Sequence, residues 1–242
     1  MKAASVTLPV ALAFLGLVGC SSDQAPPTGP DLKKAAAPSA NARIIPPVAS
    51  PGGKSYGEWA AEWWKWALGT AASVNPLLDA TGEHCGVGQP DHVWFLAGSF
   101  GGSVNRQCTV PAGRPLFFPI VNSGYFAFLN DPPATRTEEF VRAQAACIED
   151  AVINLVEIDG TAVQNPKQYL EKSPLFTVVL PEDNIFGATP DVIPELTLSP
   201  SVDEGLYLYL TPRQPGEHTI RWQASSAACG TAQDVTYHLT VK

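Results

Sequence analysis

The chain has 242 residues, of which 45% are hydrophobic, and its 15 basic and 23 acidic residues give a formal net charge of −8. No basic run longer than a pair occurs, which excludes an ordinary nucleic-acid-binding protein and a polybasic membrane contact. The length and the ten phenylalanines predict one domain of ordinary size with a buried core.

Residues 1–19 have the organisation of a secretory signal peptide. Lys2 supplies a positive charge, and a short apolar run from Val6 to Val18 follows it. This run is too short to span a bilayer in the mature protein, so we expect it to be removed. The stretch Leu17-Val18-Gly19-Cys20 resembles the lipobox of bacterial lipoproteins. The resemblance implies cleavage before Cys20 and lipidation of its thiol; the alternative is a plain secretory signal with an incidental cysteine.

The residues after the cysteine predict a tether. Ser21 follows the cysteine directly, and the lipoprotein resemblance then implies the outer membrane in a cell that has one. Several acyl chains on one cysteine anchor a protein stably to a membrane. Residues 20–53 are rich in Pro, Ala and Ser, which predicts a flexible segment between the anchor and a single domain over residues 54–242.

The first predicted element of the domain is an α-helix that ends near Leu68. Ser55 and Glu58 have the spacing of a capping box, and Gly69 supplies a stop. Aromatic residues share one face of this helix at helical spacing: Tyr56, Trp59, Trp63 and Trp66, widened by Trp64. Such a stripe first predicts packing against the core. The alternative is that Trp59, Trp63 and Trp66 form a ligand surface that stacks on sugar rings or anchors a protein partner.

A second helix is predicted from a capping box at residues 135–138 to about Asp150, with one face made by Phe140, Gln144, Cys147 and Ala151. Runs typical of strands cover residues 92–97, 105–110, 116–121, 152–158, 161–163 and 174–180. The glycine-rich turn between the first two runs predicts a hairpin, and Asp159-Gly160 predicts another.

The C-terminal third predicts strands with one buried face. Leu206, Leu208 and Leu210 alternate with Tyr207 and Tyr209, so we expect the two tyrosines on the exposed face, as a second candidate ligand surface. Residues 219–222 and 235–241 alternate in the same way. The whole pattern predicts a mostly β protein, an antiparallel β-sandwich with two accessory α-helices.

Besides Cys20, the chain has four cysteines: Cys85, Cys108, Cys147 and Cys229. An even number in an exported protein predicts two disulfides, with four free buried thiols as the alternative. Three connectivities are possible. We favour Cys85–Cys108 with Cys147–Cys229, because the first pair flanks the predicted hairpin.

No catalytic or metal site is predicted. Ala97-Gly98-Ser99-Phe100-Gly101 differs by one residue from the G-x-S-x-G nucleophile elbow, but a strand rather than a helix is predicted to follow it. The histidines form no close ligand pair, and coordination by His84, His92 and nearby acids is only a weaker alternative to ordinary loop polarity. We therefore expect no cofactor and no bound metal.

Three parts of the domain resemble a group of exported bacterial proteins without assigned activity. They are the Trp-rich helix leading into residues 75–79, residues 108–113 before Phe117-Phe118-Pro119, and residues 215–220. The resemblance implies a single domain and no catalytic residue. We expect a membrane-anchored cell-envelope lipoprotein that serves as a binding or structural module for an envelope glycan or protein. The alternative is an envelope hydrolase acting on a glycan or ester, with its site in the loops from Gly98 to Arg106.

Overall fold

The computed structural model describes residues 43–242. The predicted signal peptide, the lipobox with Cys20 and most of the predicted tether lie outside the described residues. Within residues 43–242, ten strands form two sheets, and no helix there is long and apolar enough to span a membrane.

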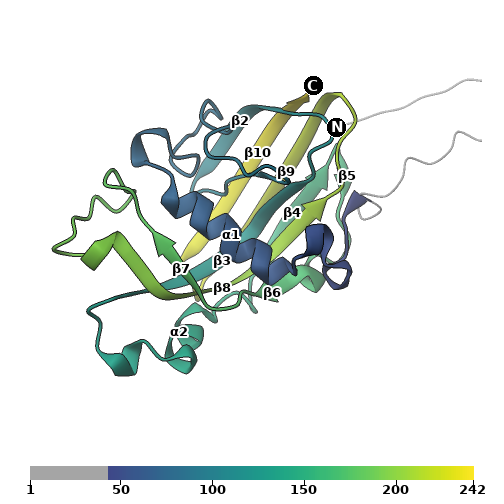
Figure 1. Ribbon diagram of the computed structural model, residues 1–242. Helices are drawn as coiled ribbons and strands as arrows, with labels where there is room; N and C mark the ends of the chain where they lie inside the picture. Colours follow the sequence, from purple (N-terminus) through teal and green to yellow (C-terminus); the bar gives the residue numbers. More distant parts are fainter. Residues whose placement is uncertain (1–42) are drawn as a thin grey trace, which may run out of the picture. The chain divides into compact units, whose positions relative to one another are not determined.

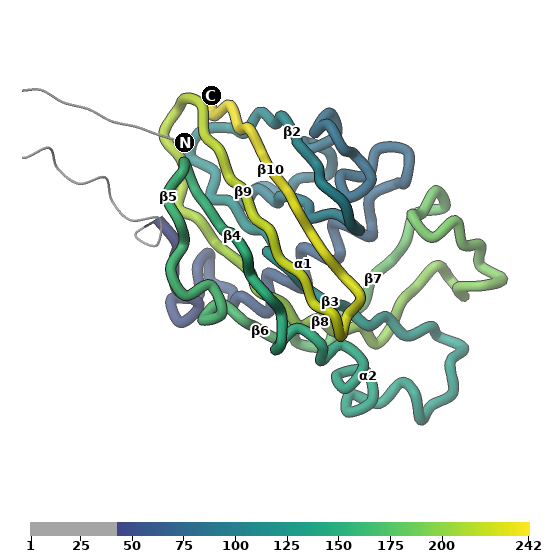
Figure 2. Tube along the Cα trace, turned by 180° about the vertical axis from the view of Figure 1, so that it is seen from behind, coloured from purple at the N-terminus to yellow at the C-terminus, as the bar shows by residue number. Residues whose placement is uncertain are grey.

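The two sheets pack face to face (Figures 1 and 2). The first contains β1 (Trp94–Phe95), β3 (Leu116–Phe128), β8 (Thr197–Leu210) and β6 (Leu170–Lys172) in that order, with β7 (Phe176–Val179) also paired to β8. The second has the order β2 (Ser103–Val110), β10 (Thr231–Val241), β9 (Gly216–Ser226), β4 (Val152–Ile158) and β5 (Thr161–Ala162). Phe118 of β3 stacks on Trp222 of β9 between the sheets, with ring centroids 5.1 Å apart. The predicted β-sandwich with two helices is confirmed.

Strand pairing is mainly antiparallel, with two parallel exceptions that the sequence did not predict. β1 pairs in parallel with β3, and β2 pairs in parallel along its whole length with β10. The predicted hairpin of residues 92–97 with 105–110 is therefore wrong, because β1 and β2 belong to different sheets. Full-length pairing with β10 gives β2 far more ladder hydrogen bonds than the short β1 could offer. The hairpin at Asp159-Gly160 is confirmed by the antiparallel pairing of β4 with β5.

Helix α1 (Tyr56–Gly69) covers the outer face of the first sheet (Figure 1). Its capping box is present as predicted, with the Glu58 amide donating to Ser55 Oγ and the Ser55 amide donating to Glu58 Oε2. Because the helix lies on this sheet, the expectation that Tyr207 and Tyr209 are exposed is wrong, and both are buried. Tyr209 packs against Trp59 with ring centroids 5.9 Å apart. Strand β8 is thus buried on both faces, by α1 and by the second sheet.

Helix α2 (Glu138–Ala145) is shorter than predicted and begins later. Thr137 caps it, while the segment before it forms a 3-10 turn at Pro133–Thr135. After Ala145 the chain leaves the helix and carries Cys147 to its disulfide partner. The predicted continuation to Asp150 is therefore wrong, and the residues of this helix that face the core are Val141 and Ala145.

Both favoured disulfides are confirmed. Cys85 bonds to Cys108, and Cys147 bonds to Cys229, across sequence separations of 23 and 82 residues. The second bond connects the segment after α2 to the turn between β9 and β10. Ser226 supports this turn, because its hydroxyl donates to the Cys147 carbonyl and accepts from the Cys229 amide.

The C-terminal end of the predicted tether belongs to the domain. Ile44 is buried and forms a β-bridge with Leu210. Arg43 pairs with Asp159 at 2.9 Å, and the Pro51 carbonyl accepts a hydrogen bond from the Trp59 indole. Residues 43–53 therefore contact the rest of the described domain through Arg43, Ile44 and Pro51.

Candidate functional site

A pocket of about 250 Å³ lies where α1, the loop before β2, strand β3 and the β9–β10 turn meet. We call it the Ser99 pocket. Its lining comprises Trp63, Trp64, Leu77, Gly98, Ser99, Phe100, Asn122, Cys229, Gly230, Thr231 and Gln233. It contains one residue of the predicted aromatic surface, Trp63, and the loop that the hydrolase alternative had singled out. The two sequence features, distant from each other along the chain, meet at one site.

Glycines shape the loop that carries Ser99. A Cβ atom on Gly98 would lie 2.5 Å from Gln233 Oε1, so a larger residue there would have to displace the Gln233 amide. Gly101 and Gly102 have φ values of 134° and 74°, which glycine adopts without the steric cost of a side chain. The glycines that gave the sequence its likeness to a nucleophile elbow are thus explained by loop geometry, and strand β2 follows them as predicted.

Ser99 lacks the surroundings of a catalytic nucleophile. The residue is 7% exposed, and its Oγ has no hydrogen-bond partner among the described residues. A serine nucleophile requires a base within about 2.6–3.2 Å of its hydroxyl. None of the residues that line the pocket is a histidine, lysine, arginine or carboxylate, and Cys229 is bonded to Cys147. The chemistry available in this lining is hydrogen bonding and aromatic packing.

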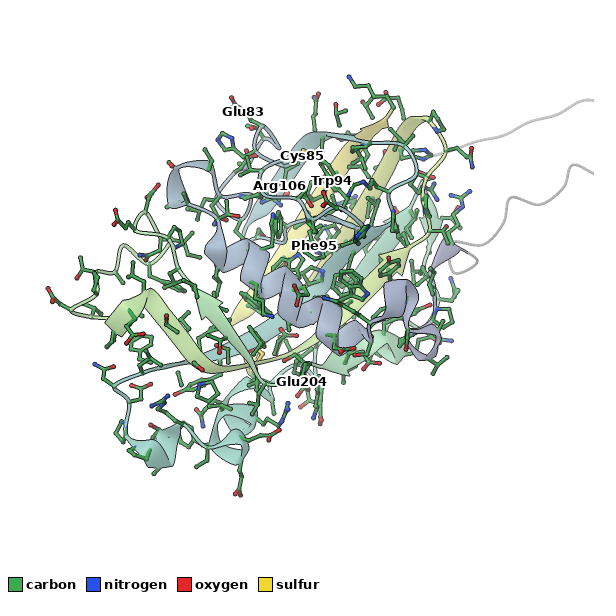
Figure 3. The ribbon with its side chains drawn as sticks, viewed as in Figure 1. Glu83, Cys85, Trp94, Phe95, Arg106 and Glu204 are labelled. Carbon is green, nitrogen blue, oxygen red and sulfur yellow. A yellow bond between two sulfur atoms is a disulfide. The ribbon has the colours of Figure 1, made fainter. Side chains whose placement is uncertain are left out.

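Arg106 holds the back of the loop in place. The side chain is 1% exposed and is labelled in Figure 3. Its Nη1 donates to the carbonyls of Ala97 and Gly98 at 2.6 and 2.9 Å, and its Nε donates to the Asp79 carbonyl at 2.6 Å. The guanidinium also lies over the Tyr237 ring, 5.4 Å from its centroid. Sequence analysis named Arg106 only as the end of the loop region of the hydrolase alternative, although its spacing from Cys108 and Val110 places it on the buried face of β2.

A buried carboxylate connects two other walls of the pocket. Asp203 accepts hydrogen bonds from the Trp64 indole at 2.6 Å and from the Tyr207 hydroxyl at 2.9 Å. The Asn122 amide donates to the same Tyr207 hydroxyl at 2.9 Å. Burial raises the pKa of the Asp203 carboxyl to about 7, although the hydrogen bonds from Trp64 and Tyr207 lower it in part. Trp64 and Asn122 are therefore held by a single buried hydrogen-bond network.

The other predicted surface residues lie elsewhere. Trp59 and Trp66 are only 6% and 8% exposed and line a separate hollow of about 650 Å³ together with Phe95. Their indole nitrogens donate to the backbone carbonyls of Pro51 and Val87 at 2.7 and 2.9 Å. The burial of these rings shows that the aromatic stripe packs against the sheet. This is the alternative that the sequence favoured over a ligand surface.

The loop around His84 is closed by internal hydrogen bonds. Asp79 accepts from the backbone amides of Thr81, Gly82 and His84, at 2.8 to 3.0 Å. Although burial raises the pKa of the Asp79 carboxyl, these hydrogen bonds lower it more, so its pKa lies below the usual range. Residues 43–242 contain no group of three or more His, Cys, Asp or Glu side chains placed to hold a metal ion.

Comparison with known proteins gives no family. No protein-family model and no curated protein matches the chain. Among solved structures, the chain is similar to a cysteine protease inhibitor from Entamoeba histolytica, with 14% sequence identity over 56% of this chain and 86% of that one. The TM-score of 0.19 is too low for this likeness to support a shared fold or function.

Proposed function

We propose that this protein is a lipid-anchored cell-envelope binding module that holds its ligand in the Ser99 pocket without converting it chemically. One observation carries the proposal: a preformed pocket combines aromatic, hydroxyl and amide groups and has no titratable side chain in its lining. Ligand sites are typically concave and largely apolar, with a few placed polar groups. General acid–base catalysis would instead need a titratable group at the reacting atoms.

The rigidity of the pocket supports binding as its role. Arg106 fixes the carbonyls of residues 97 and 98, and the Cys147–Cys229 bond fixes the turn at residues 229–231. Gln233 Oε1 accepts from the Ser99 amide at 3.3 Å and from the Trp222 indole at 3.4 Å. A preorganised site loses little conformational entropy when its ligand binds, which favours affinity.

We predict that the lipid anchor depends on Cys20. Replacing it with serine should abolish incorporation of radiolabelled palmitate and move the protein from the membrane fraction to the soluble fraction, because the acylated thiol is lost. The measurement is fractionation of the bacterial host followed by immunoblotting. Ser22→Ala is the control and should leave both labelling and fractionation unchanged. Membrane association of Cys20→Ser equal to that of the wild type would contradict the anchor.

We predict that filling the pocket removes binding to the envelope. In the mature chain with Cys20→Ser, a further Ser99→Trp change places an indole in the pocket and should weaken co-sedimentation with purified envelope glycan by at least about tenfold. Ser103→Trp is the matched control, because Ser103 is exposed at the start of β2. Thermal unfolding of both variants checks that they are folded. Undiminished co-sedimentation of folded Ser99→Trp would show that the pocket is not the binding site.

A further inference from the structure

We infer that the Ser99 pocket accepts a single neutral sugar ring of an envelope glycan, with Phe100 packing on the apolar face of the ring. This inference rests on the proposed binding function and specifies the ligand class of the same site. Four properties of the pocket support it: its volume, its lack of charge, its polar groups and the exposure of Phe100.

The volume suits one small ring. At about 250 Å³ the pocket is smaller than the roughly 300–1,000 Å³ of sites that enclose a drug-sized molecule. It is nevertheless about eight times the ~30 Å³ that one water occupies in the liquid. A single ring fits this space, and an extended oligomer would place only one of its units inside.

The charge of the site excludes ionic ligands. No cationic side chain lines the pocket to pair with a carboxylate, sulfate or phosphate, and no carboxylate lines it to pair with an amine. The chain as a whole carries a net charge of −8, which repels polyanions such as nucleic acids. Burying a charged group without a partner is costly, so the ligand unit inside the pocket should be neutral.

The polar groups of the pocket match hydroxyl groups. Ser99 and Thr231 supply hydroxyls, which both donate and accept, and Asn122 and Gln233 supply amides. Ser99 Oγ is buried and has almost no exposed surface, so the half-buried Asn122 and Thr231 are the residues whose polar groups a ligand hydroxyl can best reach. Sugar hydroxyls point outward around the ring and also act as both donors and acceptors. Half-buried amide and hydroxyl groups from β3 and from the start of β10 can therefore meet hydroxyls of one sugar unit.

Phe100 supplies an aromatic face at the rim. It is 64% exposed, whereas Trp64 in the pocket wall is buried. A large exposed aromatic side chain at the mouth of a pocket is available for a ligand without disturbing the core. A sugar ring has an apolar face of C–H groups, which packs on an aromatic ring while its hydroxyls reach the polar groups. The positive-φ glycines that follow Phe100 let the loop hold this ring at the rim.

The test is competition for the co-sedimentation of the mature chain with envelope glycan. The competitors are glucose, galactose, mannose and N-acetylglucosamine as neutral sugars, glucuronate as an anionic sugar, and adenosine as a neutral stacking ring. We expect at least one neutral sugar to displace the protein at millimolar concentration, and glucuronate and adenosine to fail. Phe100→Ala should weaken binding of that sugar about tenfold, and Phe100→Tyr should restore it. The control Phe186→Ala removes an aromatic residue that is also exposed, at 51%, and lies outside the pocket lining, so it should have no effect.

The outcomes separate the ligand class from the proposed function. If Ser99→Trp abolishes glycan binding but no neutral sugar competes, or if glucuronate or adenosine competes as well as the sugars, the neutral-sugar inference is overturned and the binding function stands. If folded Ser99→Trp still binds the glycan, both are overturned. Equal sugar affinity of Phe100→Ala and wild type would overturn the role of Phe100 in sugar binding.

Discussion

Replacing Trp63 with alanine is expected to lower the free energy of unfolding by about 3–5 kcal/mol. The side chain is 1% exposed, and its indole nitrogen donates to the Leu96 carbonyl at 3.0 Å. The ring packs edge-on against Trp64 and Trp66, with centroid distances of 5.0 and 6.1 Å. Alanine would leave a cavity beneath α1 and a carbonyl without its partner. Guanidinium denaturation followed by circular dichroism measures the loss.

Two variants give this measurement its controls. Lys65→Ala changes a neighbouring position whose ammonium pairs with Glu62 at the surface, so its effect should stay within about 0.5 kcal/mol. Trp63→Phe keeps an aromatic ring in the same place and should lose less stability than the alanine variant. If Trp63→Ala unfolds at the same denaturant concentration as Lys65→Ala, the aromatic stripe of α1 does not serve as a core.

Asp203 is expected to make the domain less stable as the pH rises from about 4 to about 7. The pKa of its carboxyl is raised from an ordinary 3.8 to about 7, mainly by burial and to a smaller extent by the charge of the neighbouring Glu204, which is labelled in Figure 3. The folded protein therefore retains a proton that the unfolded chain releases. Over the whole titration, this proton contributes about 4 kcal/mol to the free energy of unfolding. About 2–3 kcal/mol of this contribution is lost between pH 5 and pH 8.

The direction of the effect follows from proton binding. In this pH range the folded state binds more protons than the unfolded state, so the free energy of unfolding falls as pH rises. Asp203→Asn is uncharged, like the protonated form, and keeps an oxygen that accepts from the Trp64 indole. The free energy of unfolding of the variant, relative to that of the wild type, should therefore increase by about 2–3 kcal/mol from pH 5 to pH 8.

Comparing the two proteins at each pH cancels the contributions of other groups, including the four histidines. Urea denaturation at pH 5, 6, 7 and 8 gives the difference in the free energy of unfolding between Asp203→Asn and wild type at each pH. Asp183→Asn is a matched control, because Asp183 is a surface carboxylate that accepts from the Ser73 amide and its pKa is lowered rather than raised. A constant difference between Asp203→Asn and wild type across this range would show that the buried carboxyl has an ordinary pKa.

The fold class and several local features were predictable because short-range interactions determine them. The capping box of Ser55 and Glu58 starts α1 wherever the helix later packs, and Asp159-Gly160 closes its hairpin through backbone conformations that few other pairs adopt. Both disulfides were predicted correctly, although one reason for preferring them was wrong. The chain between Cys85 and Cys108 passes from β1 in the first sheet to β2 in the second and does not form a hairpin.

The sequence by itself therefore determined the fold class, helix α1, the periodicity of the C-terminal strands and the number of cysteine pairs. Only the tertiary structure decided what covers each face. Alternation along β8 shows that Tyr207 and Tyr209 share a side, but it contains no information that α1, far earlier in the chain, lies on that side. The Ser99 pocket is a second case, because its walls come from α1, the loop before β2, strand β3 and the β9–β10 turn. Local patterns report on neighbours along the chain, whereas a pocket depends on which distant segments pack together.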